Sequence, residues 1–238
     1  MREGVAVLRL DQVLITNGAF RLAADISVAA GAKLAVMGPS GAGKSTLVNG
    51  IAGFHDVPEG HMTWQGQDIT HLPPGKRPVA MLFQDSNLFP HLTVRQNAGL
   101  GVRPDLKLSA SDWARVDQAV ARVGLSDLAE RRPAELSGGQ QSRAALARVL
   151  VQAKPILILD EPFSALGPAL KHEMLDLVDE LVTESGATVL MVTHDPDDAA
   201  RLADQIVLVA DAKAHPPKDV QTMLADPPPA LKAYLGQK

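Results

Sequence analysis

The sequence predicts an α/β fold built on a largely parallel sheet. Five short aliphatic runs have the composition of strands that are buried on both faces: Leu34–Met37, Val79–Phe83, Ile156–Leu159, Thr188–Val192 and Ile206–Ala210. Longer segments with helical periodicity lie between them, and strands that alternate with helices favour a parallel sheet. The aromatic content of 3% agrees, because such a core must be built mainly from Leu, Val, Ile and Ala.

The clearest helical segment is Pro168–Glu184. Its apolar residues fall on one face, Pro168 suits the first turn, and Gly186 follows the end. The spacing therefore predicts an amphipathic helix between two buried strands.

The middle of the chain lacks strand-like runs from about Asp85 to Gln152. A capping segment, Ser109–Asp112, precedes a predicted helix over Trp113–Val123, and a second helix is expected from about Gly139 to Val151. We interpret residues 86–152 as a helical insertion in a single domain. Its core would comprise about residues 1–85 and 153–210, followed by a proline-rich tail over 211–238 with only weak helical character.

Bulk composition excludes several classes of protein. The net charge is −4 and no basic run is present, which disfavours binding to nucleic acid. The absence of cysteine excludes disulfides and thiolate metal sites. The segment Met1–Leu10 lacks the apolar core of a secretory signal, and the apolar runs are too short to span a bilayer, so we expect a cytoplasmic or membrane-peripheral protein without a transmembrane segment.

A glycine-rich octet with the spacing of a phosphate-binding P-loop follows the first predicted strand. Its glycines allow backbone N–H groups to approach phosphate oxygens, and the next helix adds its positive dipole end. Lys44 supplies charge for the β- and γ-phosphates, and the Ser45 hydroxyl can bind Mg²⁺. A glycine-rich turn without a ligand is the alternative. The predicted nucleotide-binding residues are Gly38, Pro39, Ser40, Gly41, Ala42, Gly43, Lys44, Ser45 and Thr46.

Two acids, Asp160 and Glu161, end the buried run Ile156–Leu159. Uncompensated charge at the end of a buried strand is costly, so we expect these acids to interact with a bound ion or ligand. A nucleotide's magnesium would explain Asp160 as a metal ligand, and an attacking water would explain Glu161 as the group that activates it. A solvated surface turn is the alternative, and the P-loop disfavours it.

The pentapeptide Leu136–Gln140 lies between these two sites and reads LSGGQ. With the P-loop and the acidic strand in this order, it resembles the signature of the ABC ATPases. The resemblance implies a P-loop NTPase core with an antiparallel β portion near the N-terminus, and ATP and Mg²⁺ as ligands. It further implies a head-to-tail dimer in which Ser137, Gly138, Gly139 and Gln140 of one copy contact the ATP held by the other.

The resemblance extends to three other positions. Gln84 matches the glutamine that senses Mg²⁺ and the attacking water, His194 matches the histidine that contacts the γ-phosphate, and Ser164–Leu166 matches the D-loop at the dimer seam. The resemblance thus implies Lys44, Gln84, Glu161 and His194 as catalytic residues. It implies Ser45, Gln84 and Asp160 as metal ligands.

Some positions depart from the family pattern. Gly167 stands where the D-loop usually has Asp, and Ser142 replaces the usual Gln after the signature. Phe20 is the one aromatic residue in Val13–Phe20 that could stack on adenine, and a packing role explains it equally well. The acids Asp195, Asp197 and Asp198 are expected simply to begin a helix.

The stretches Arg77–Val94 and Gly99–Leu108 resemble those of ATP-binding subunits of bacterial thiamine importers. This implies three partners: a second copy of the chain, a separate transmembrane permease, and indirectly a periplasmic or extracellular solute-binding protein. The expected location is the cytoplasmic face of the cell membrane. Import of another small solute, an ABC ATPase acting on nucleic acid or ribosomes, and a P-loop kinase are the alternative functions.

Overall fold

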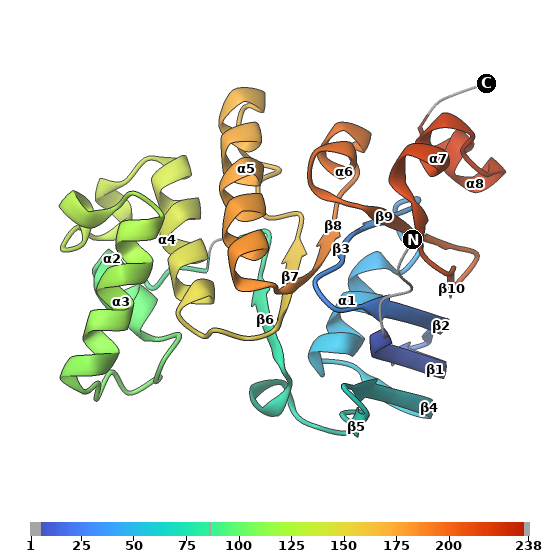
Figure 1. Cartoon of the computed structure of the whole chain (residues 1–238), viewed down its shortest axis with the longest axis horizontal. Coiled ribbons are helices and arrows are strands. Elements are labelled where there is room, and N and C mark those ends of the chain that lie inside the picture. The colour runs from blue at the N-terminus through green and yellow to red at the C-terminus, as the bar shows by residue number, and fades with distance from the viewer. Residues whose placement is uncertain (1–5, 86, 236–238) are drawn as a thin grey trace.

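The structure is a computed structural model that describes residues 6–85 and 87–235. The residues Met1–Val5 of the expected non-signal N-terminus lie outside this range, as do Ser86 and the last three residues of the tail. Among the described residues, each predicted buried run forms a strand (Figure 1): β3 Lys33–Met37, β6 Val79–Leu82, β7 Ile156–Asp160, β8 Thr188–Val192 and β9 Gln205–Ala210.

These five strands form the predicted parallel sheet, in the order β9-β3-β8-β7-β6. Their carboxyl ends therefore meet at one edge, where Asp160 pairs in register with Val192. Side chains alternate along each strand and serve both faces. In β7, Ile156 and Ile158 pack on one side, whereas Leu157 and Leu159 pack on the other.

An antiparallel portion extends the sheet near the N-terminus, as expected. It consists of β1 Ala6–Asn17, β2 Phe20–Ala29, β4 Asp56–Trp64 and β5 Gln67–Asp68. The short strand β10 Lys213–Ala214 joins β2 to β9, and β11 Lys218–Asp219 pairs with β9 on its own.

The helices cover both faces of the sheet (Figure 1). Helix α1, Lys44–Ala52, packs between the antiparallel portion and the parallel strands through Leu47, Val48 and Ile51. Helix α5, Pro168–Ser185, covers the other face through Met174, Val178 and Leu181. The remaining C-terminal helices are α6 Pro196–Leu202, α7 Val220–Ala225 and α8 Pro229–Tyr234.

The residues between β6 and β7 carry helices and no strand in their described part. These are α2 Val94–Gly99, α3 Ala110–Arg122 and α4 Gly138–Leu150, with 3-10 turns at Pro74–Lys76 before β6 and at Ser126–Leu128 and Pro133–Glu135. Ser109 caps α3 as the sequence predicts, and its hydroxyl accepts from Asp112 N. No helix of the described residues is long and apolar enough to cross a membrane.

Candidate functional site

The phosphate loop connects β3 to α1 and depends on glycine for its shape. Gly38, Gly41 and Gly43 have φ of 150°, 76° and 107°, values that L side chains rarely adopt. Gly43 is the N-cap of α1, and no side chain of the described residues caps that helix end. Its first N–H groups are therefore available to an anion.

Lys44 begins α1, and its ammonium folds back over the loop. Nζ donates to Gly38 O at 2.8 Å and to Pro39 O at 3.0 Å. Burial lowers the pKa of Lys44, and the negative charges of Glu161 and Asp160 oppose that shift. The loop thus holds a half-buried cation between two carboxylates at the edge where the strands end.

Asp160 is the last residue of β7, and Glu161 directly follows it. Burial raises the pKa of Asp160, and Glu161 raises it further, although a hydrogen bond from Ser45 and the charge of Lys44 act against this. A hydroxyl beside a carboxylate is a suitable donor pair for Mg²⁺, which takes few protein ligands and completes its shell with water and phosphate. The described residues therefore fit that ion at Ser45 and Asp160.

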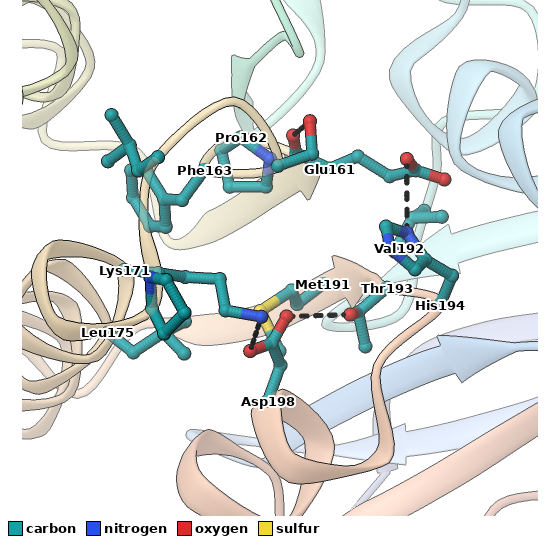
Figure 2. A pocket seen from close by; sticks show the side chains of 13 residues that line it. Glu161, Pro162, Phe163, Lys171, Leu175, Met191, Val192, Thr193, His194 and Asp198 are labelled. Atoms are coloured by element: carbon teal, nitrogen blue, oxygen red, sulfur yellow. Dashed lines mark hydrogen bonds and ion pairs between the residues drawn. The ribbon is translucent and has the colours of Figure 1, made fainter. Parts of the chain in front are cut away.

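Gln84, Glu161 and His194 follow three adjacent strands, β6, β7 and β8, at one edge of the sheet, and Figure 2 shows Glu161 beside His194. His194 Nδ1 lies 3.4 Å from Glu161 Oε2. Gln84 Nε2 reaches Ser164 Oγ at 3.5 Å, and that hydroxyl donates to Glu161 O at 3.1 Å. Glu161 has a φ of 47°, an uncommon value for a non-glycine residue that recurs at functional sites.

A surface hollow extends from the phosphate loop to Glu161. Phe20, the first residue of β2, is half-buried there, and its ring lies where a Cβ on Gly43 would come within 2.8 Å of Cε1. The ring therefore both packs on the core and borders the hollow, so the two interpretations of Phe20 coexist. The hollow is lined by Asn17, Phe20, Ser40, Gly41, Gly43, Lys44, Ser45, Thr46 and Glu161.

The signature segment starts α4 and is not part of this hollow. Ser137 is an exposed N-cap whose hydroxyl accepts from Gln140 N at 3.3 Å, while Gln140 Oε1 accepts from Ser137 N at 2.9 Å. A Cβ on Gly139 would lie 2.5 Å from Leu170 Cδ2, so α4 approaches α5 closely at this point. Figure 1 shows α4 on the far side of α5 from α1, so one chain does not bring Ser137 to its own Lys44.

Two contacts at the site were not predicted. Asp198 was expected only to start a helix, but it is buried and pairs with Lys171 of α5 at 2.7 Å. Tyr234 of α8 donates to His194 O at 3.3 Å, and its ring centroid lies 5.8 Å from Lys44 Nζ. The tail's weak helical pattern gave no signal for a contact with residues so distant in sequence.

Comparison with known proteins agrees with these features. The model of the ABC transporter family matches residues 23–164. The thiamine import ATP-binding proteins ThiQ of Ruegeria sp. strain TM1040 and of Cereibacter sphaeroides are each 60% identical over 230 residues, covering 97% of this chain and all of those proteins. A nucleotide-free ATP-binding cassette from an ABC transporter superposes with a TM-score of 0.87 at 25% identity, covering 98% of this chain and 100% of that one.

Proposed function

Because this chain belongs to the ABC transporter family, we propose that it is the ATP-hydrolysing subunit of an importer and that the imported solute is thiamine. The observation that supports this most is the division of the site. The P-loop, Asp160, Glu161 and His194 share one edge of the sheet, whereas Ser137 is the exposed N-cap of α4, a helix that Figure 1 shows on the other side of α5 from α1.

Each chain would contribute half of two nucleotide sites. In a head-to-tail pair, Ser137 and the N–H groups at the start of α4 would face the phosphates bound by the partner's P-loop. Gly138 is exposed and leaves that helix end free of a side chain that would block the approach, whereas Gly139 lets α4 pack against Leu170 of α5. Asn17 and Phe20 border the hollow on the side of β1 and β2, so we assign Phe20 to the adenine.

In the proposed reaction, water attacks the γ-phosphate of ATP. Lys44 leaves the carbonyls of Gly38 and Pro39 and binds the β- and γ-phosphates, which stabilises the charge that develops on them. Glu161 orients the water, and His194 holds Glu161 and contacts the γ-phosphate. Gln84, which follows β6, senses the attacking water. Mg²⁺ on Ser45 and Asp160 would supply further positive charge.

The partner for transport would be a separate permease, so the chain would act at the cytoplasmic face of the membrane, with a solute-binding protein as an indirect partner. We propose that residues 86–152, set into a core of 1–85 and 153–210, provide the docking surface. Phe89, next to α2, is 48% exposed, and such an apolar side chain suits a contact with another protein.

The substrate proposal relies on the relatives named for thiamine import. It is tested by co-purifying the chain with its permease, reconstituting both in vesicles with the solute-binding protein, and measuring ATP-dependent uptake of labelled thiamine. Uptake that unlabelled thiamine suppresses is the expected result. ATP turnover with no thiamine uptake would refute the proposal that thiamine is the imported solute, and the proposal that the chain hydrolyses ATP would still hold.

The hydrolysis proposal is tested with Glu161→Gln. Loss of a general base typically costs about 10²–10⁴-fold in rate, while the P-loop is untouched. The variant should bind ATP normally, release phosphate slowly and run as a dimer in ATP by light scattering. Undiminished phosphate release would contradict the role of Glu161, and transfer of phosphate to an acceptor would indicate a kinase instead.

A further inference from the structure

Lys171 connects the start of α5 to the start of α6 beneath the catalytic edge (Figure 2). It lies four residues after Gly167, in the first turn of α5. Its Nζ lies 2.5 Å from Asp195 Oδ2 and 2.7 Å from Asp198 Oδ1, and its side chain is only 16% exposed. One cation thus contacts two carboxylates that follow β8.

Asp198, in turn, holds the backbone on either side of His194 through the hydroxyl of Thr193. Asp198 Oδ2 accepts from Thr193 Oγ1 at 3.0 Å, and the same hydroxyl accepts from Asp195 N at 3.0 Å. Thr193 and Asp195 are the chain neighbours of His194. The side chain of His194 is 59% exposed, so its own packing does little to fix its position.

Charge makes Lys171 necessary for this arrangement. Burial acts to lower the pKa of Lys171, but hydrogen bonds with Asp195 and Asp198 outweigh it and raise the pKa. Without the ammonium, two carboxylates would repel each other, and Asp198 would be left buried without its cation. The segment Thr193–Asp195, which carries His194 and depends on both carboxylates for its position, would then move.

A simple tie between two helices is the alternative explanation. The helices α5 and α6 already share a second ion pair, in which Arg201 donates twice to Asp176 at 2.7 and 2.6 Å. What distinguishes Lys171 is that one of its partners, Asp195, directly follows His194, while the other, Asp198, accepts from Thr193, which directly precedes it.

We infer that Lys171 is a positioning residue that sets His194 against Glu161. This inference depends on the proposed hydrolysis of ATP. If it holds, Lys171 affects turnover through His194, and binding of ATP is left nearly unchanged.

The chain offers a matched control in Lys33. Its Nζ lies 2.5 Å from Asp179 Oδ1 and 2.8 Å from Thr183 Oγ1, both on α5, and its side chain is 17% exposed. Lys33→Met therefore removes a comparable buried tie to the same helix at a place remote from His194. The experiment compares Lys171→Met, Lys171→Arg and Lys33→Met in the full chain, with phosphate release, KM for ATP and thermal midpoint measured for each.

For Lys171→Met we expect kcat to fall about tenfold with KM within about twofold, since small displacements of catalytic groups cost up to about a hundredfold. Lys171→Arg should recover at least about a third of the wild-type kcat, because a guanidinium can span both carboxylates. Lys33→Met should lower the thermal midpoint to a similar extent and leave kcat within about twofold.

A background of His194→Ala decides the mechanism. If Lys171 acts through His194, adding Lys171→Met there should change kcat by less than about twofold. An equal tenfold loss in that background, or equal kcat losses in Lys171→Met and Lys33→Met, would overturn the inference. A wild-type chain that releases no phosphate would instead refute the proposed function.

Discussion

The first glycine of the phosphate loop offers a sharp test of the fold. A Cβ built on Gly38 would lie 2.0 Å from the carbonyl oxygen of Val209 in β9, and the φ of Gly38 is 150°. Real Cβ atoms keep at least 3.0 Å, so a methyl would have to move by about 1 Å. Val209 is fully buried in the sheet beside β3, so little can yield. Gly38→Ala should therefore perturb the core as well as the loop.

The magnitude follows from two costs. Overpacking a dense core costs about 1–3 kcal/mol, and a strained backbone adds about 1–3 kcal/mol. We expect Gly38→Ala to lower the free energy of unfolding by about 3–5 kcal/mol. Gly41→Ala has a φ of +76° with nothing within 4 Å of the new Cβ, so only strain of about 1–2 kcal/mol applies.

Urea unfolding, followed by tryptophan fluorescence, measures the difference in the free energy of unfolding between Gly38→Ala and Gly41→Ala, provided that the two variants have the same m. With m near 2–3 kcal/mol/M, the midpoint of Gly38→Ala should fall about 0.3–2 M below that of Gly41→Ala. Gly18→Ala, with a φ of +59° and open space in the turn between β1 and β2, controls for strain alone. Gly41 lines the nucleotide hollow, so its variant should fold but bind ATP poorly. Equal midpoints for Gly38→Ala and Gly41→Ala would refute the close approach of the loop to β9.

Three further outcomes are expected. Because the folded-state pKa of Asp160 is raised above its usual 3.8, the ionised carboxylate opposes folding above that raised pKa and the penalty disappears as pH falls through it. Asp160→Asn should therefore stabilise the metal-free chain in urea at neutral pH, by an amount that shrinks in acid, and an unchanged or lower stability would contradict this. Gly167→Asp should fit without a clash, since a Cβ there meets nothing within 4 Å. The variant should raise the ATPase rate or its cooperativity in ATP. If neither changes, the missing Asp of the D-loop does not limit hydrolysis or coupling in this chain. Tyr234 is the single tyrosine, so fluorotyrosine labelling should give one ¹⁹F resonance. The chemical shift of this resonance should change when ATP binds at Lys44. A resonance whose chemical shift is the same with and without ATP would exclude the tail from the site.

Local patterns in the sequence predicted much of this molecule. Ile156–Leu159 has no polar residue on either face, as expected of a strand covered on both sides, and the structure places it in β7, between β6 and β8. Helix α5 begins at Pro168 and is followed by Gly186 with a φ of 67°, as the spacing predicted. The P-loop was equally predictable, because its residues are contiguous and its geometry depends on their own backbone freedom.

Other features required the tertiary structure. Asp198 looked like a helix-start acid, and only the packing of α5 against α6 makes it the buried partner of Lys171. Phe20 could not be placed until β2 was seen to run beside the phosphate loop, and Tyr234 could not be connected with His194 at all.

The difference arises because a local sequence pattern reflects only interactions between residues that are close together in the chain. Periodicity, capping and turn preference act over a few neighbouring residues, and so they determine strands, helices and continuous motifs. Which strand ends become neighbours depends on the order of the whole sheet. Here β8 lies between β7 and β3, and that arrangement, set by burial of apolar surface across the entire chain, brings Glu161 and His194 together beside the phosphate loop.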